Sequence, residues 1–296
     1  MSMPLSTQLS IGIASKNRPA VLEATLRKIH AFGLGDCPLI LFDDGSTPPL
    51  NPPAIGLFKN ARVLRSEPSV GQALGRNQIC EQAATPFLLQ LDDDSYPVEG
   101  DVDKLIDFAT TTPDWLAIAI PFEEPARGRK WPAGIPKDKA IPIRSFVGCS
   151  VLLNIKQFRS IGGYATWIGR TAEEEELSLR SWKAGMPTLS IDLLRIRHEV
   201  TDMGRDVNGI AYRSFRNWLL LWLCHAPLRT IPNRLLRLLG ASLGHFLSRG
   251  EISSIRGFFA GIKMAPNIVR QYRDPLSTQQ YIRYRSLPHA LDLFLK

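Results

Sequence analysis

Short apolar runs alternate with helical periodicities along the first 120 residues of the chain. The strand-like runs lie at 8–15, 38–42, 61–65, 86–91 and 115–120. Between them, apolar residues recur at helical spacing over 19–33, 71–84 and 102–109. Strands that alternate with helices are typical of an α/β domain with a mostly parallel sheet. The pattern therefore predicts such a sheet flanked by helices, with any ligand bound at the carboxyl ends of the strands.

The pattern becomes less regular after residue 120. Residues 124–142 are rich in Pro, Gly and Lys and are interpreted as a loop, either a substrate lid or a plain connection. Residues 145–153 are strand-like, and a short helix follows. Thr171 and Glu174 have the spacing of a capping box, which predicts a helix that ends near Gly185. Residues 189–200 are predicted to form an extended segment that carries His198.

Two of the predicted strands end in carboxylates. One leads into Asp92, Asp93 and Asp94, and the other leads into Asp43 and Asp44. Three adjacent like charges repel one another, and a divalent cation would relieve that repulsion. Mg²⁺ and Mn²⁺ prefer oxygen ligands and commonly share them with substrate phosphates. The alternative is a solvated acidic turn, but the position at strand ends favours an enzyme that binds a phosphate-bearing donor through a metal ion.

A second group of candidate residues lies on the helix and strand that follow. Four glutamates, 173–176, occupy one helical turn. Capping and the helix dipole explain part of this cluster. Capping does not require all four, so one of them is a candidate general base. His198 follows this helix and is either a structural residue or a metal ligand.

Composition restricts the class of protein. With 296 residues and 44% hydrophobic content, the chain fits one large domain or one domain plus an extension. Its four cysteines are scattered without paired spacing, which predicts reduced thiols in a cytosolic protein and no zinc site. No signal peptide pattern and no apolar run of membrane-spanning length is visible.

The positive charge is concentrated near the C-terminus. Residues 205–296 contain 14 Lys and Arg against 4 Asp and Glu, within a total net charge of +8. Residues 209–273 are predicted to be helical and amphipathic, with an apolar stripe of Leu235, Leu236, Leu239, Leu243 and Phe246. These helices either pack on the main domain, contact an anionic membrane surface or form a homo-oligomer. Nucleic acid is not expected, because the aromatic residues here fit an apolar face better than stacking platforms.

Taken together, the order and spacing of six segments resemble the family 2 glycosyltransferases, which are inverting enzymes of the GT-A fold. The resemblance covers about residues 8–224 and is closest to rhamnosyltransferase-like bacterial members that build surface polysaccharides. It implies a Rossmann-like GT-A catalytic domain over 1–204 and an α-helical C-terminal extension over 205–296. The matching segments are 13–18, 42–46, 71–77, 91–94, 173–185 and 212–217.

The resemblance also implies roles for single residues in binding the nucleotide. Ala14, Asn17 and Arg18 would border it. Asp44, or alternatively Asp43, would accept a hydrogen bond from the base, and Arg76 would also contact the base. The nucleotide-binding residues are then Ala14, Asn17, Arg18, Asp43, Asp44, Arg76, Asp92 and Asp93.

Further implied roles concern the metal ion and catalysis. Asp92 would hold the ribose or a metal-bound water, Asp94 would bind Mn²⁺ or Mg²⁺ directly, and His198 would be a further ligand. Glu174 aligns with the general base that deprotonates the acceptor. The family has Glu-Asp where this chain has Glu173 and Glu174, so the base could instead be Glu173.

The implied function is transfer of a sugar from a nucleotide-diphosphate sugar, preferably of UDP or dTDP, to a saccharide or lipid-linked acceptor. It would take place in the cytoplasm, with peripheral contact with the inner face of the membrane as a further expectation. The alternatives are a catalytically silent sugar-nucleotide-binding scaffold and a nucleotidyltransferase. Residues 10–19 lack the Gly-rich phosphate loop that a nucleotidyltransferase would ordinarily have. The chain departs from the family pattern at a second place: relatives often continue Asp-Gly-Ser with Thr-Asp, whereas here Ser46 and Thr47 are followed by Pro48-Pro49.

Overall fold

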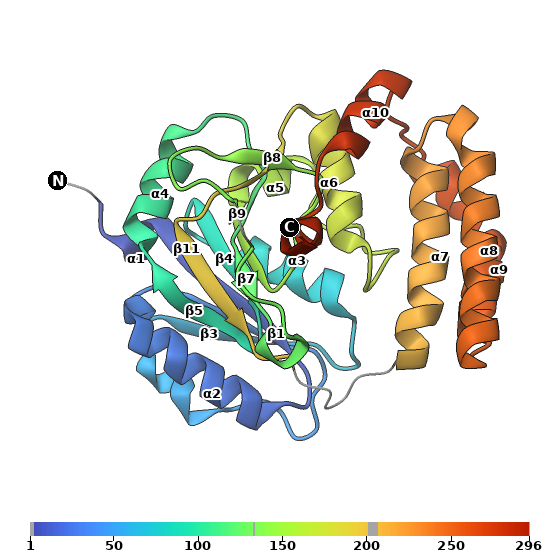
Figure 1. Cartoon of the computed structure of the whole chain (residues 1–296). Coiled ribbons are helices and arrows are strands. Elements are labelled where there is room, and N and C mark those ends of the chain that lie inside the picture. The colour runs from blue at the N-terminus through green and yellow to red at the C-terminus, as the bar shows by residue number, and fades with distance from the viewer. Residues whose placement is uncertain (1–2, 133, 201–206, 296) are drawn as a thin grey trace.

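The protein consists of an α/β part and a helical C-terminal part that lies beside it (Figure 1). The computed structural model describes residues 3–132, 134–200 and 207–295. The strands are β1 (Leu9–Ser15), β2 (Leu39–Asp43), β3 (Ala61–Arg65), β4 (Phe87–Asp92), β5 (Ser95–Gly100), β6 (Ala117–Ala119), β7 (Phe122–Glu123), β8 (Ile141–Ile143), β9 (Ser150–Asn154), β10 (Thr188–Ser190) and β11 (Leu194–His198). The helices are α1 (Leu5–Gln8), α2 (Pro19–Ile29), α3 (Gln72–Gln82), α4 (Val102–Thr111), α5 (Ile155–Ser160), α6 (Glu173–Lys183), α7 (Val207–His225), α8 (Ile231–Arg249), α9 (Ser253–Tyr272) and α10 (Thr278–Ser286).

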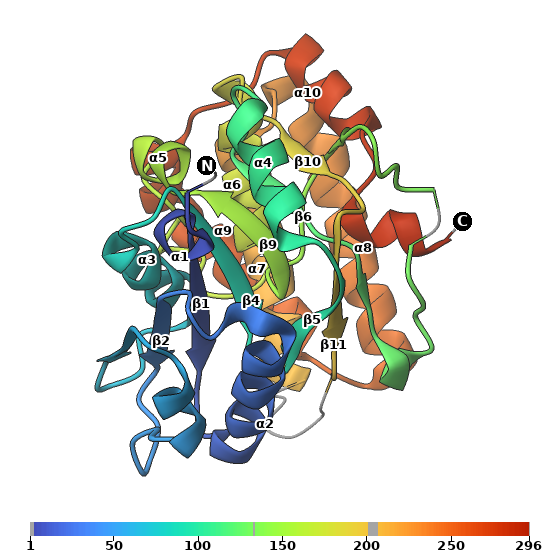
Figure 2. The ribbon, with the colours of Figure 1, turned by 90° about the vertical axis from the view of Figure 1, so that its left-hand side faces the viewer.

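The main sheet has eight strands in the order β3-β2-β1-β4-β9-β6-β10-β8. Strands β1 to β4 pair in parallel, and β9 runs antiparallel to both β4 and β6. Its central strands are apolar on both faces because helices cover both. Leu22 of α2 and Leu105 of α4 pack on one face, and Ile79 of α3 and Leu177 of α6 pack on the other. The predicted α/β architecture is therefore confirmed (Figure 2).

A second, three-stranded sheet was not predicted. Its order is β5-β11-β7, and β5 runs antiparallel to β11. Its strands are short and come from distant parts of the chain, so local periodicity gives a weak signal for them. Because β5 starts directly after Asp94, the acidic triplet lies at a tight turn between β4 and β5. The register pairs His198 with Ser95, which brings the histidine to that turn.

The predicted capping box at the start of α6 is wrong. The helix begins at Glu173, and the residue in the N-cap position is Ala172 rather than Thr171. Thr171 and Ala172 both adopt left-handed backbone conformations, with φ values of 74° and 71°. Among the described residues no side chain caps this helix, and the Glu174 carboxylate contacts Arg76 instead.

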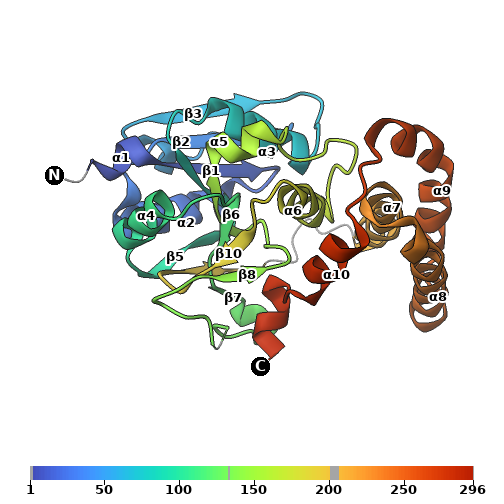
Figure 3. The same ribbon diagram turned by 90° about the horizontal axis from the view of Figure 1, so that it is seen from above.

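The predicted helices of the C-terminal part are present as α7 to α10, and Figure 3 shows α7, α8 and α9 stacked on one side of the α/β part. Leu220 of α7, Leu238 of α8 and Phe258 of α9 share one apolar core. Helix α10 returns to the α/β part, where Tyr284 packs against Trp182 of α6. The proposed domain boundary at 204/205 lies outside the described residues.

The predicted apolar stripe of α8 is divided between two surroundings. Leu235 and Leu239 pack inward, whereas Leu236, Leu243 and Phe246 are exposed. None of the helices in the described ranges combines the length and the apolar character that a bilayer crossing requires.

Candidate active site

The turn between β4 and β5 separates three carboxylates into two environments. Asp92 lies at the end of β4 with its side chain 30% exposed, whereas Asp93 and Asp94 are buried. Arg18, just before α2, donates hydrogen bonds to Asp93 at 2.6 Å and to Asp94 at 2.8 Å. Ser15 Oγ donates a further bond to Asp93 at 2.6 Å. Asp93 is thus paired with Ser15 and Arg18, while Asp92 and Asp94 lie close to His198.

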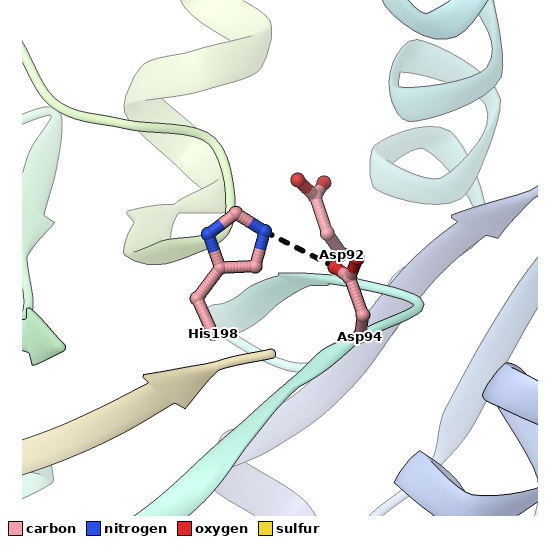
Figure 4. A group of neighbouring side chains, drawn as sticks. All are labelled: Asp92, Asp94 and His198. Carbon is pink, nitrogen blue, oxygen red and sulfur yellow. Dashed lines mark ion pairs between the residues drawn. The ribbon is translucent and has the colours of Figure 1, made fainter. Parts of the chain in front are cut away.

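Asp92, Asp94 and His198 form a cluster with the composition of a metal site (Figure 4). Each of the three side chains offers one ligand atom, and these three atoms all lie within 4.8 Å of one another. Two carboxylates and an imidazole suit divalent ions such as Mn²⁺. Ligands on opposite sides of a small divalent ion are roughly 4 Å apart, so the three side chains fit one ion after small adjustments.

Both ring nitrogens of His198 contact carboxylates. Its Nδ1 lies 3.0 Å from Glu124 Oε1, and its Nε2 lies 3.1 Å from Asp94 Oδ1. Burial lowers the pKa of His198, but Cys149, Asp94 and Glu124 raise it more, so the net shift is upward. Burial raises the pKa of Asp94, but His198 and Arg18 outweigh it and lower that pKa to about 2. A metal ion would take the place of the proton between Nε2 and Asp94.

Glu124 is a site residue that sequence reasoning missed. It is buried and also accepts hydrogen bonds from Arg127 and Arg129. A carboxylate on the far nitrogen of a metal-binding histidine fixes the tautomer and the orientation of the ring. The residue lies in the segment interpreted as a loop, and only the pairing of β7 with β11 brings it to His198.

A cavity of about 790 Å³ opens over the acidic turn. This volume is typical of a small-molecule or cofactor site. Of the residues predicted to bind ligand or metal, eight line it: Ala14, Asn17, Arg18, Asp44, Asp92, Asp93, Asp94 and His198. Arg170, Arg213 and Arg216 line it as well, and the last two belong to α7. Residues 212–217 had matched the family pattern, but no role was predicted for these arginines.

The two aspartates at the end of β2 differ in what surrounds them. Asp43 is buried and accepts hydrogen bonds from the backbone N–H groups of Ser46, at 2.9 Å, and Leu50, at 3.1 Å, and from Arg65. Burial raises its pKa, but these bonds lower it further than burial raises it. Asp43 therefore stabilises the turn that contains Pro48 and Pro49. Asp44 borders the cavity, and its predicted hydrogen bond to the nucleotide's base stays a prediction.

Arg76 lies behind the cavity wall. It is buried and contacts Asp92 at 2.9 Å, Glu174 at 3.2 Å and Glu173 at 3.4 Å. Within the described ranges it is not among the residues that line the cavity. Its predicted contact with the base stays a prediction; the contacts observed connect the acidic turn to the start of α6.

Glu173 and Glu174 also differ in exposure. The Glu174 side chain is 19% exposed, and that of Glu173 is 3% exposed. Glu174 accepts an additional hydrogen bond from the Gly148 N–H at 3.2 Å. Burial, together with the charge of Glu174, raises the pKa of Glu173, and Glu173 Oε2 has no hydrogen-bond partner within the described residues. Neither residue lines the described cavity, but Glu174 is the more accessible of the two.

Comparison with known proteins identifies the family. A family profile described as "Glycosyl transferase family 2" matches residues 10–165, which is just over half of the chain. The chain therefore belongs to glycosyl transferase family 2. A search of curated protein sequences gave no match.

Solved structures of glycosyltransferases share the fold. A structure of GalNAc-T7 with UDP, GalNAc and Mn²⁺ matches with a TM-score of 0.58 at 15% identity, over 90% of this chain and 58% of that one. The mannosyltransferase PcManGT from Pyrobaculum calidifontis, in complex with GDP-Man and Mn²⁺, matches with a TM-score of 0.54 at 14% identity, over 98% and 86%. TarS residues 1–349 from S. aureus, in complex with UDP, matches with a TM-score of 0.50 at 14% identity, over 88% and 91%. The chain thus spans less than two thirds of the GalNAc-T7 chain.

Proposed function

We propose that the protein is a metal-dependent inverting glycosyltransferase that uses a nucleotide-diphosphate sugar. The observation that carries this proposal is the cavity over Asp92, Asp94 and His198, together with Glu174, which Arg76 connects to Asp92. The proposed metal site and the proposed acceptor base thus contact the same arginine. Membership of family 2 supports glycosyl transfer as the class of reaction.

The charges around the cavity suit a nucleotide-diphosphate donor. Mn²⁺ or Mg²⁺ on Asp92, Asp94 and His198 would stabilise the charge on the departing diphosphate. Arg213 and Arg216 add positive charge to the cavity wall. Asp44, Ala14 and Asn17 then border the nucleoside. UDP or dTDP is the preferred nucleotide. The GalNAc-T7 structure contains UDP and Mn²⁺, and the PcManGT structure contains GDP-Man and Mn²⁺, which supports a nucleotide-sugar donor and a divalent ion.

The proposed reaction is a single displacement. The acceptor hydroxyl attacks the anomeric carbon and forms the new glycosidic bond, while the bond from that carbon to the phosphate oxygen breaks. The hydroxyl proton passes to Glu174, and the nucleotide diphosphate leaves. One displacement inverts the configuration at the anomeric carbon. The resemblance favours a hexosyl or deoxyhexosyl donor such as a rhamnosyl nucleotide, and a saccharide or lipid-linked acceptor in surface polysaccharide synthesis.

Release of nucleotide diphosphate tests this reaction. The protein is incubated with UDP-, dTDP- and GDP-sugars, with Mn²⁺ and with chelator, and free nucleotide diphosphate is measured with and without saccharide acceptors. Acceptor-stimulated, Mn²⁺-dependent release from one donor supports the proposal. Binding without release would favour the silent scaffold. Pyrophosphate formation from a nucleoside triphosphate and a sugar phosphate would favour a nucleotidyltransferase.

A change at Glu124 is expected to weaken metal binding without removing a ligand. In Glu124→Gln the His198 ring loses a charged partner at Nδ1, so the Mn²⁺ affinity should fall about 10- to 100-fold. Titration with Mn²⁺, followed by calorimetry, measures this change. Glu99→Gln is the matched control, because Glu99 contacts Arg195 on the same small sheet and lies away from the cluster. Unchanged Mn²⁺ affinity in Glu124→Gln would contradict the role of Glu124 in orienting the His198 ring.

We also propose that α8 and α9 contact the anionic inner face of the cytoplasmic membrane, where a lipid-linked acceptor would be reached. Residues 228–273 contain eight Arg and Lys and one acidic residue. Exposed apolar side chains lie among these cations, so the surface matches both acyl chains and anionic headgroups. The exposed residues of this basic apolar face are Leu236, Leu243, Leu247, Phe259, Ile262, Arg237, Arg249, Arg256, Lys263 and Arg270.

Vesicle sedimentation tests the membrane contact. Binding should be at least tenfold stronger to vesicles that contain phosphatidylglycerol than to phosphatidylcholine vesicles, and it should weaken in Arg237→Glu/Lys263→Glu. Lys59→Glu on the α/β part serves as a control. It changes the charge by the same amount as either single substitution, but at an exposed site away from this face. Equal binding to both vesicle types, or a concentration-dependent dimer that hides the face, would contradict the proposal; the dimer would favour a homo-oligomer interface.

A further inference from the structure

Asn217 of α7 is fully buried against the loop that leads into α6. Its Nδ2 donates to the backbone carbonyls of Ile168, at 3.1 Å, and of Arg170 and Thr171, each at 2.8 Å. Its Oδ1 accepts a hydrogen bond from Arg216 Nε at 2.8 Å. Arg216 donates a second bond to the Ile168 carbonyl at 2.9 Å. One side chain of α7 therefore contacts three carbonyls of this loop, which share its two N–H hydrogens.

The backbone held by Asn217 has an unfavourable conformation. Thr171 and Ala172 are both left-handed, with φ of 74° and 71°. A Cβ atom disfavours this region, and such residues persist where the surroundings hold them in place. Glu173, the first residue of α6, follows directly. The conformation of this turn thus determines where α6 begins.

The same loop contacts the metal-site side of the fold. The Gly169 carbonyl accepts a hydrogen bond from the Ala73 N–H at 2.9 Å. Ala73 lies on α3, the helix that also carries Arg76. Arg76 in turn contacts both Asp92 and Glu174. The loop therefore lies between α7 and the residues that connect the acidic turn to the start of α6.

We propose that Asn217 is a positioning residue for transfer: it holds residues 168–172 in the left-handed turn and so sets the position of Glu174 relative to the cavity. This inference rests on the proposed function, because it takes Glu174 as the acceptor's base. It also assigns a catalytic contribution to α7, which lies outside the region that the family profile matches.

Asn217→Ala is expected to lower kcat at least tenfold and to leave nucleotide diphosphate affinity within about twofold. The reason is that the loop loses its hydrogen bonds to Asn217, while Asp92, Asp94 and His198 are not among the partners of Asn217. Arg216, which lines the cavity, loses its bond to Asn217 but keeps its bond to the Ile168 carbonyl. Ser254→Ala is the matched control. It removes a buried hydrogen bond between α9 and α8, at 2.9 Å, that does not involve the loop. Its kcat should stay within twofold of wild type.

A second substitution separates positioning from general loss of structure. Glycine adopts the left-handed conformation readily, so Ala172→Gly should restore at least half of the kcat lost in Asn217→Ala. Ala172→Gly alone should leave kcat nearly unchanged. Failure of this rescue, or parallel losses of kcat and nucleotide affinity in Asn217→Ala, would overturn the inference.

Hydrogen exchange gives a readout that does not depend on sugar transfer. The amides of residues 169–176 should exchange at least tenfold faster in Asn217→Ala than in wild type, and those of β4 should not change. Unchanged exchange in 169–176 would refute the positioning role. If the loop exchanges faster but wild-type protein transfers no sugar to any acceptor, the contact between α7 and the loop stands and the proposed function fails.

Discussion

Glu174→Gln is expected to lower the rate of sugar transfer by about 10²- to 10⁴-fold, the usual contribution of a general base. The amide cannot accept the acceptor's proton, but it keeps the size of the side chain and can still contact Arg76 and the Gly148 N–H. Donor affinity should therefore change less than about threefold. The measurement is kcat from nucleotide diphosphate release, with nucleotide affinity from calorimetry on the same variant.

Glu173→Gln is the matched control for this prediction. Glu173 is buried, and burial raises its pKa. Replacing it with a neutral amide should therefore lower the rate less than Glu174→Gln does. If Glu173→Gln abolishes transfer and Glu174→Gln does not, the base is one residue earlier. Full activity in both variants would contradict a carboxylate base at the start of α6.

Asp94→Ala is expected to abolish Mn²⁺-dependent nucleotide binding. The substitution removes one of the two carboxylates of the cluster and leaves Arg18 and His198 without this partner. Since a metal ion contributes several kcal/mol to stabilising the departing charge, we expect transfer to fall by about 10²-fold or more. Calorimetry of Mn²⁺ with nucleotide diphosphate, together with the rate of donor turnover, measures both effects.

Asp107→Ala is the control for Asp94→Ala. Asp107 is exposed on α4, so its loss changes the net charge equally without touching the cluster. Nucleotide binding in Asp107→Ala should match wild type. Retained Mn²⁺-dependent binding in Asp94→Ala would remove this residue from the metal site and weaken the assignment of the cluster as a whole.

The main sheet could be predicted from sequence because its signals are local. Each of β1, β2 and β4 is a mostly apolar, buried run of five to seven residues, and β3 is a five-residue strand that follows a turn. The pairing of β5 with β11 joins residues about a hundred positions apart, so the local pattern of apolar residues does not predict it. His198 could therefore be proposed as a ligand from the resemblance, whereas its position beside Asp94 and its partner Glu124 required the structure.

The residues of the candidate site also differ in how far the sequence alone could predict their positions. Asp92 and Asp94 stand out because three carboxylates are adjacent in the chain. Arg76 was predicted to contact the nucleotide from the resemblance, but its burial among carboxylates from the end of β4 and the start of α6 required the structure. The capping interpretation of Thr171 was wrong because Asn217, far away in sequence, stabilises a left-handed turn at this point. Tertiary contacts of this kind override local propensity.

Calorimetric titration of UDP, dTDP, GDP and ADP into the protein, with and without Mn²⁺, tests the central claim most directly. The claim is that Asp92, Asp94 and His198 bind a nucleotide-diphosphate donor through a divalent ion. It predicts that UDP or dTDP binds at least tenfold more tightly with Mn²⁺ than without it, and more tightly than ADP. Equal affinities with and without Mn²⁺, or no binding of any of the four nucleotides, would contradict it.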